Sequence, residues 1–365
     1  MAINSSDHLI KPLNIGLTSW QPDTPAIGPG NAKREIRLNG RDHLEGLNLN
    51  FSWGVHQGLG EWHAGLDPHV HPYPECLLFV GLDSANVNYL GAEVDCCLGA
   101  EQEIYPFDEP TAIVIPAGLP HGPITTKRMY SPRGFGFWAV ELNPVAEITW
   151  LGQGGSTLSA GQLRAFPKGV NFAAAEKILR NKPIPATGKY AHQVKSMKSN
   201  LLIERGKYSP SGFTPEQLAR QEERGKKTGE RLGPGNADHL IWMCGKDLGA
   251  MDLTLAWGFC SRPGISRRGT GAHVHPVDEV LVYLGTDPDN IDYLGAEIEI
   301  DMGEGHERHL INKPAAIICP AGVPHMPQVT RWVDRPFAVF AIGLSGEYET
   351  RAFDQPRAAG LKEEI

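Results

Sequence analysis

Histidines and glutamates recur in this 365-residue chain at a spacing that suits metal binding. The first set is HVHPYPE, starting at His69, followed about fifty residues later by PAGLPHG, which ends just past His121. Residues i and i+2 of a strand point to one side, so His69 and His71 share a face with Glu75. A later strand, entered through the proline and glycine turn, can bring His121 opposite them.

The same residues appear again 204 positions later. HVHPVDE and PAGVPHM carry the second set: His273, His275, Glu279 and His325. Three neutral imidazoles and one carboxylate suit Fe(II), our first expectation, and also Mn(II), Ni(II), Co(II) or Zn(II). A six-coordinate metal keeps two positions for substrate, oxygen or water, whereas a closed structural zinc site more often uses cysteine. We therefore expect two divalent transition metal ions per chain, in sites of catalytic type.

The repeat organises the whole chain. Gly81, Tyr89, Gly91 and Pro116 also recur at the 204-residue offset, and GPGNA near Gly28 recurs near residue 233. An internal duplication of this kind fixes the architecture before any propensity argument. We predict an N-terminal arm (1–27), a first barrel (28–143), a linker or insertion (144–232), a second barrel (233–345) and a C-terminal tail (346–365).

Each repeat has the pattern of β-structure. LNLNFSWG from Leu47 and MDLTLAWG from Met251 alternate apolar with polar or small residues, as half-buried strands do. Many short strands with turn signals about every ten residues favour a sandwich or closed barrel. The linker differs: 172–180 and a segment capped by Thr214 are predicted to be short helices. It is expected to connect and cover the barrels, with a lid over one site as the alternative, and its charged run 224–231 to be solvated.

The two motifs resemble those of the cupin superfamily, and the chain is similar to its two-barrel members. That resemblance implies an all-β fold of two cupin (double-stranded β-helix, or jelly-roll) barrels. It also implies that the three histidines and the glutamate of each set are the metal ligands.

Other residues carry weaker signals. Trp53 and Trp257 occupy matched inward positions, where core packing competes with a role as a substrate wall. His56 and His63 occur only in the first repeat and are candidate acid/base groups, with packing or surface histidines as the alternative. Met326 stands where the first repeat has Gly122, so the first pocket is expected to be roomier.

Composition narrows the partners. A formal charge of −8 and a pI near 6.0 disfavour nucleic-acid binding, which depends on clustered Lys and Arg. The chain lacks a signal-peptide pattern and any apolar run of membrane-spanning length, so a cytoplasmic protein without membrane contact is expected. Six cysteines, without CxxC spacing, are expected to be buried free thiols. A small molecule is the expected partner, and self-association is left open.

Two classes of function follow. The first is a metal-dependent enzyme acting on a small oxygen-rich molecule. Within it, the resemblance favours a dioxygenase, and a non-redox lyase, decarboxylase or isomerase is the alternative. The second class is a small-molecule-binding protein whose metals are structural.

Overall fold

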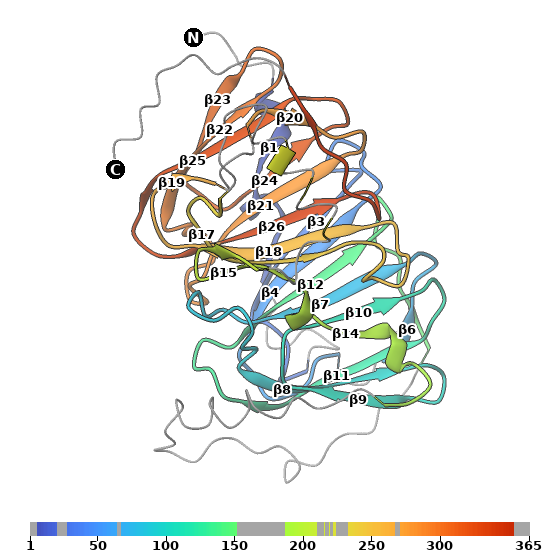
Figure 1. The fold of residues 1–365 in the computed structure, drawn as a ribbon. Coiled ribbons are helices and arrows are strands. Elements are labelled where there is room, and N and C mark those ends of the chain that lie inside the picture. The colour runs from blue at the N-terminus through green and yellow to red at the C-terminus, as the bar shows by residue number, and fades with distance from the viewer. Residues whose placement is uncertain are drawn as a thin grey trace.

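The computed structural model describes residues 6–19, 28–63, 67–151, 187–209, 233–266 and 271–353, with Pro215, Ala219, Glu222 and Glu223. Strands dominate this part of the chain (Figure 1), which confirms the all-β prediction. Short 3-10 helices accompany them: η1 (Asp7–Leu9), η2 (Leu13–Gly16), η4 (Ala191–Gln193) and η5 (Lys198–Asn200).

Barrel 1 consists of two antiparallel sheets. The larger has the order β14 (Val194–Ser196), β10 (Thr111–Ile115), β7 (Glu75–Val80), β12 (Phe135–Glu141), β4 (Asn50–His56), β3 (Arg34–Asn39) and β2 (Leu17–Ser19). The smaller has the order β13 (Thr149–Trp150), β6 (His69–Val70), β11 (His121–Met129), β8 (Ala92–Leu98) and β9 (Glu103–Phe107), with β5 (Gly60–Glu61) also on β11.

Barrel 2 repeats this plan. Its larger sheet has the order β1 (Ile10–Pro12), β24 (Ala315–Cys319), β21 (Glu279–Gly285), β26 (Phe337–Gly343), β18 (Thr254–Cys260), β17 (Ala237–Met243), β15 (Leu201–Glu204) and β16 (Lys207–Tyr208). Its smaller sheet has the order β23 (Glu307–Ile311), β22 (Ala296–Met302), β25 (His325–Val333), β20 (His273–Val274) and β27 (Arg351–Ala352), with β19 (Gly264–Ile265) on β25. The predicted duplication into two barrels is confirmed.

The two large sheets pack against each other between the barrels. The ring centroids of Trp53 on β4 and Trp257 on β18 are 5.5 Å apart. Trp138 of β12 stacks on Phe340 of β26, with ring centroids 4.2 Å apart. These side chains belong to one hydrophobic cluster that spans both barrels, while a second cluster fills the interior of barrel 1. Aromatic pairs of this kind contribute beyond their buried area. The barrels therefore share a core.

Of the two interpretations of Trp53 and Trp257, the packing favours the core and not the substrate wall. Trp53 and Trp257 point away from the barrel interiors, into the interface between the sheets, and are not pocket walls. The cause is that both faces of each large sheet are buried. Alternation identifies the two faces of a strand, but it does not tell which of two buried faces lines the barrel.

Segments that the sequence assigns to an arm and a linker complete the sheets. The N-terminal segment adds β1 to barrel 2 and then β2 to barrel 1. The segment before barrel 2 does the reverse, with β14 in barrel 1 and β15 in barrel 2. Each barrel thus receives an edge strand from the segment preceding the other barrel. Such strand exchange protects sheet edges and ties the barrels together.

The predicted helix at 172–180 and the charged run 224–231 lie outside the described residues. In the stretch that begins at Thr214, the four described residues Pro215, Ala219, Glu222 and Glu223 are helical, and the others also lie outside. No helix among the described residues has the length and hydropathy needed to cross a membrane.

Candidate metal centres and the cavity of barrel 1

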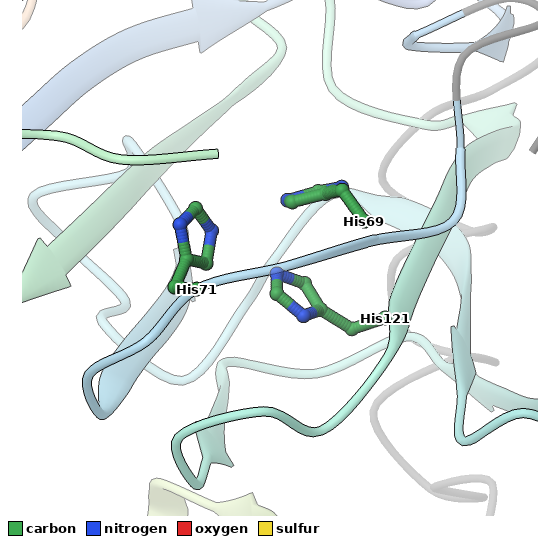
Figure 2. Close-up of side chains that lie close together, drawn as sticks. All are labelled: His69, His71 and His121. Carbon is green, nitrogen blue, oxygen red and sulfur yellow. The ribbon is translucent and has the colours of Figure 1, made fainter. Parts of the chain in front are cut away.

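Three histidines converge inside barrel 1, as Figure 2 shows. His69 lies on β6 directly opposite His121, the first residue of β11, and His71 follows β6. One ring nitrogen from each lies within 4.8 Å of the others. Glu75 opens β7 and approaches the same point, with its Oε2 3.1 Å from Nε2 of His121 and 3.6 Å from Nε2 of His71. The structure thus brings all four predicted ligands of this barrel together.

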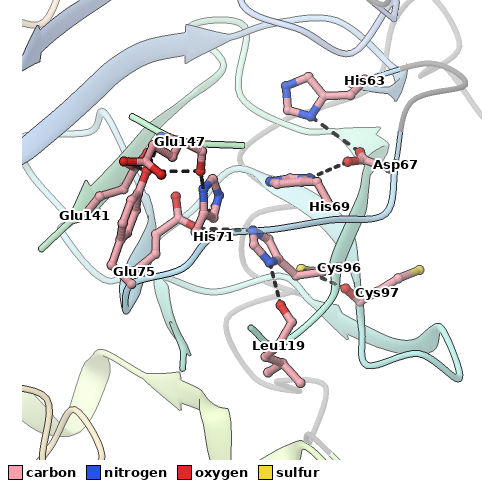
Figure 3. Close-up of polar contacts among 12 residues, drawn as sticks. His63, Asp67, His69, His71, Glu75, Cys96, Cys97, Leu119, Glu141 and Glu147 are labelled. Atoms are coloured by element: carbon pink, nitrogen blue, oxygen red, sulfur yellow. Dashed lines mark hydrogen bonds and ion pairs between the residues drawn. The ribbon is translucent and has the colours of Figure 1, made fainter. Parts of the chain in front are cut away.

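Hydrogen bonds fix the orientation and the protonated nitrogen of each imidazole ring. Nδ1 of His71 lies 2.7 Å from the carbonyl oxygen of Glu147, and Nδ1 of His121 lies 3.0 Å from that of Leu119. A carbonyl oxygen can only accept, so each Nδ1 carries the proton. Nδ1 of His69 lies 2.6 Å from Oδ1 of Asp67 (Figure 3). Each Nε2 is therefore left with a lone pair for a metal ion.

Buried acceptor atoms at the centre of this cluster have no hydrogen-bond partner in the described part of the chain, which a bound cation would supply. Nε2 of His71, Nε2 of His121 and Oε2 of Glu75 are buried and make no hydrogen bond to any described residue. Burial lowers the pKa of His69 to about 4, so the ring is neutral at pH 7. Burial alone would raise the pKa of Glu75, but the neighbouring imidazoles outweigh it and hold that pKa below its usual value. Three imidazoles and one carboxylate around a common point fit a divalent transition metal.

Barrel 2 repeats the arrangement. His273, His275 and His325 bring ring nitrogens within 4.8 Å of one another, and Nε2 of His325 lies 3.2 Å from Oε2 of Glu279. Backbone carbonyls of Gly271, Glu349 and Val323 accept from the three Nδ1 atoms. Burial and the two neighbouring imidazoles lower the pKa of His273 to about 3. Both ligand sets are therefore assembled for metal binding.

An acidic residue supports the barrel 1 cluster from behind. Asp67 is 1% exposed and accepts from His69, while its other oxygen lies 3.4 Å from Nδ1 of His63. Barrel 2 has Gly271 at the equivalent position, where only a carbonyl supports His273. A carboxylate behind a ligating imidazole fixes its orientation and raises its basicity. The two centres therefore differ in their surroundings although each has the same three histidines and glutamate.

A cavity of about 490 Å³ joins the barrel 1 cluster to a polar wall. The wall lies on β3, β4 and β12 and includes Glu35, Arg37, Asn50, Ser52 and Glu141. A cavity of this volume accommodates a small organic molecule. Strand register gives the barrel 2 counterparts of these residues as Leu240, Trp242, Thr254, Ala256 and Gly343. Most of the polar wall thus has no equivalent in the second barrel.

Barrel 2 has little free space around its cluster. The cavity lined by His275 and Glu279 measures about 10 Å³, and another of about 30 Å³ is lined by Met326. Met326 does not line the cavity beside the cluster, so its narrowing of the second pocket stays a prediction. Gly122, its counterpart, does not line the large cavity, because the carboxylate of Asp67 lies against it.

The two candidate acid/base histidines have different surroundings. His63 lines the cavity, beside Asp67 and 5.6 Å from the ring of Trp150. His56 is fully buried and stacks on Trp62 with ring centroids 3.7 Å apart. Its Nδ1 bonds the carbonyl of Gly30, and burial lowers its pKa to about 4. His56 is therefore a packing residue, because its strand turns this side chain into the aromatic core of the barrel.

Sequence reasoning missed Glu141. Its Oε2 accepts hydrogen bonds from the hydroxyl of Tyr73 at 2.6 Å and from Nδ2 of Asn50 at 2.8 Å. Burial raises the pKa of Glu141, and the nearby carboxylate of Glu75 raises it further. One signal was available: a lone glutamate ends an apolar strand, and the second repeat has glycine in that place. A carboxyl group at this position can exchange a proton with a bound molecule.

Comparison with known proteins gives a likeness in structure alone. No protein-family model and no curated protein matches the sequence. The chain is similar to a solved variant of Bacillus subtilis oxalate decarboxylase, at 15% identity and a TM-score of 0.48, covering 92% of this chain and 78% of the other. It is also similar to a formate complex of Lactobacillus farciminis oxalate decarboxylase, at 14% identity and a TM-score of 0.48, covering 92% and 88%. Its own strand order and ligand clusters give the chain the all-β, two-barrel fold that its motifs predicted.

Proposed function

We propose that this protein is a metal-dependent enzyme that converts a small, oxygen-rich organic molecule in the cavity of barrel 1. One observation carries the proposal: the large cavity joins a complete ligand set to a polar wall. His69, His71, Glu75 and His121 would hold the ion. Such an ion supplies Lewis acidity toward a substrate oxygen.

The composition of the wall supports a substrate with several oxygen atoms. Arg37 offers guanidinium donors, although it also bonds Oε2 of Glu35 at 2.8 Å. Asn50 and Ser52 add neutral polar groups, and apolar side chains such as Leu77 and Phe137 line the rest. A few convergent polar groups in an otherwise apolar cavity are typical of a small-molecule site. Hydroxy, keto and carboxylic acids fit this mixture.

Within this class, we propose a non-redox reaction of the lyase, decarboxylase or isomerase type. Such reactions need a proton to be moved to or from the substrate. Glu141 is held in the cavity wall by Tyr73 and Asn50, where a carboxyl group can exchange a proton with a bound molecule. His63 is a second candidate at the other side of the cavity. The sequence-based preference for a dioxygenase did not take Glu141 into account.

A dioxygenase remains the second candidate function. It is favoured by the ligand set, because three neutral imidazoles and one carboxylate suit Fe(II) and leave coordination positions open. The ligand set alone suits both types of reaction. Oxygen consumption distinguishes the dioxygenase from the non-redox enzyme.

The test is a screen of small hydroxy, keto and dicarboxylic acids with protein loaded with Mn(II) or with Fe(II). Product formation is followed by NMR with and without oxygen, and oxygen uptake is recorded in parallel. We expect turnover without oxygen, reduced at least about tenfold in Glu141→Gln. A control variant is Thr254→Val, which changes the barrel 2 counterpart of Asn50, the hydrogen-bond partner of Glu141, and should keep the turnover. Oxygen uptake linked to product would favour the dioxygenase, and two bound ions without any turnover would favour a binding protein.

A further inference from the structure

Two aromatic side chains pack beside the metal-ligand cluster of barrel 2. Trp242 and Tyr348 meet edge to face with ring centroids 4.5 Å apart, and Tyr348 also lies 4.9 Å from the ring of His275. Their barrel 1 counterparts are Arg37 and Ala146, which line the large cavity. The cavity beside the second cluster measures about 10 Å³, against about 490 Å³ beside the first.

A thiol faces the same cluster. Cys319 ends β24 directly opposite Glu279, the first residue of β21. Its Sγ lies within 4.8 Å of a carboxylate oxygen of Glu279 and of a ring nitrogen of His325. The side chain is 1% exposed. In barrel 1 the position opposite Glu75 is Ile115, which cannot bind a metal.

Ligand atoms in the second cluster are also arranged around a common point. Nε2 of His325 is buried and lies 3.2 Å from Oε2 of Glu279 without the alignment of a hydrogen bond. The proton of this ring is on Nδ1, which bonds the carbonyl of Val323. A lone pair is therefore directed into the space that the carboxylate and the thiol also face.

We propose that Cys319 is a ligand of the barrel 2 metal ion, in addition to His273, His275, Glu279 and His325, and that this ion is structural. When the ion binds, the thiol loses its proton to solvent and the sulfur bonds as thiolate. Sulfur in the ligand set shifts preference toward Zn(II) and Co(II), while the all-nitrogen-and-oxygen set of barrel 1 suits Mn(II) or Fe(II). The inference rests on metal binding at both clusters and not on the reaction in barrel 1.

Cobalt reports directly on the sulfur. The full chain is stripped of metal and reloaded with Co(II) to two ions, and its near-ultraviolet absorption is recorded. Wild-type protein should show a thiolate-to-cobalt charge-transfer band. Cys319→Ser, close in volume, and His275→Ala should both lose that band. Cys260→Ser is the matched control, because Cys260 is a buried thiol of the same barrel outside the cluster, and it should keep the band. His71→Ala should keep it as well.

Several results would overturn the proposal. Wild-type protein with two bound Co(II) ions and no band would exclude Cys319 as a ligand while leaving metal binding intact. A band that persists in Cys319→Ser would assign the sulfur elsewhere. Binding of a single ion would remove the second site altogether. As a second measurement, Zn(II) affinity of the barrel 2 site should fall about tenfold or more in Cys319→Ser, and Mn(II) affinity of barrel 1 should not change.

Discussion

The carboxylate of Asp67 occupies the space in front of Gly122. A Cβ atom at position 122 would lie 2.6 Å from Cγ of Asp67, closer than real contacts allow. Barrel 2 has the opposite pair, with Gly271 in place of the aspartate and Met326 in place of the glycine. In each barrel, therefore, only one of these two positions carries a side chain. The glycine beside His121 makes room for the acid that orients His69, and not for substrate.

Replacing Gly122 should therefore disturb the barrel 1 metal. In Gly122→Ala the methyl group displaces Asp67, and His69 loses its carboxylate acceptor. Loss of such a supporting group typically weakens metal affinity about 10- to 100-fold. Titration of the stripped protein with Mn(II), with barrel 2 already filled by Zn(II), measures the effect.

Gly118 provides the control for this substitution. Its φ of 76° is close to the 79° of Gly122, but a Cβ there meets nothing within 4 Å. Gly118→Ala has the same backbone cost without the clash, so its metal affinity should stay within about twofold. The pair exchange Asp67→Gly with Gly122→Met, which copies barrel 2, should fold better than Gly122→Met alone. Equal affinities of the two alanine variants would contradict the role given to Asp67.

Metal content should be two ions per chain. Both ligand sets are assembled, so His71→Ala should remove one ion and His275→Ala the other. The ions lie in separate barrels with separate hydrogen-bond supports, so neither change should empty both sites. Elemental analysis of protein purified without chelator gives the count. Saturation of the wild-type chain at one ion would refute this expectation.

Metal removal should lower the stability of the fold. The ligands belong to the barrel strands or lie next to them, so only the folded chain binds the ion tightly. A ligand at 100 times its dissociation constant adds about 2.7 kcal/mol per site. The melting temperature should fall on chelation and return when Mn(II) or Zn(II) is added. An unchanged melting curve after proven loss of metal would count against both sites.

Much of this arrangement could be predicted because it is repeated. Every ligand occurs twice in the sequence, at an offset of 204 residues. Strand parity placed His69, His71 and Glu75 on one side of the strand. The positions that differ between the repeats could not be interpreted in the same way. Glu141 and Cys319 act through neighbours far away in the sequence, so their roles depend on register that only the folded sheets provide.

The strand exchange between the barrels could not be predicted from the sequence, because the strands involved are too short. β1 and β14 contain three residues each, too few for a period-2 pattern to stand out. Their pairing partners lie in the other half of the chain or beyond a long linker. A short strand is stabilised by the sheet edge with which it pairs, so its own sequence need not show a strand pattern.

Acid should destabilise the metal-free protein partly through His56. Burial holds its pKa at about 4 against 6.5 in the unfolded chain, so between these values only the unfolded chain binds this proton. Stability therefore falls as pH falls through that window, by about 2 kcal/mol between pH 7 and pH 5 for this residue. His56→Phe keeps the stacking on Trp62 and should show a shallower pH dependence in urea unfolding. The same slope in both proteins would show that His56 is protonated without cost.

Activity should depend on the first barrel. Glu75 faces a cavity of about 490 Å³ with a polar wall, whereas Glu279 faces about 10 Å³ closed by aromatic rings. Once a substrate is known, Glu75→Ala should lower kcat/KM at least about 100-fold, because the ion that polarises the substrate is lost. Glu279→Ala should keep kcat/KM within a few fold but melt at a lower temperature, since it loses a structural ion. Metal content is measured on both variants, so that loss of the wrong ion is recognised. If Glu279→Ala is the inactive enzyme and Glu75→Ala retains most of its rate, the roles of the two barrels are reversed.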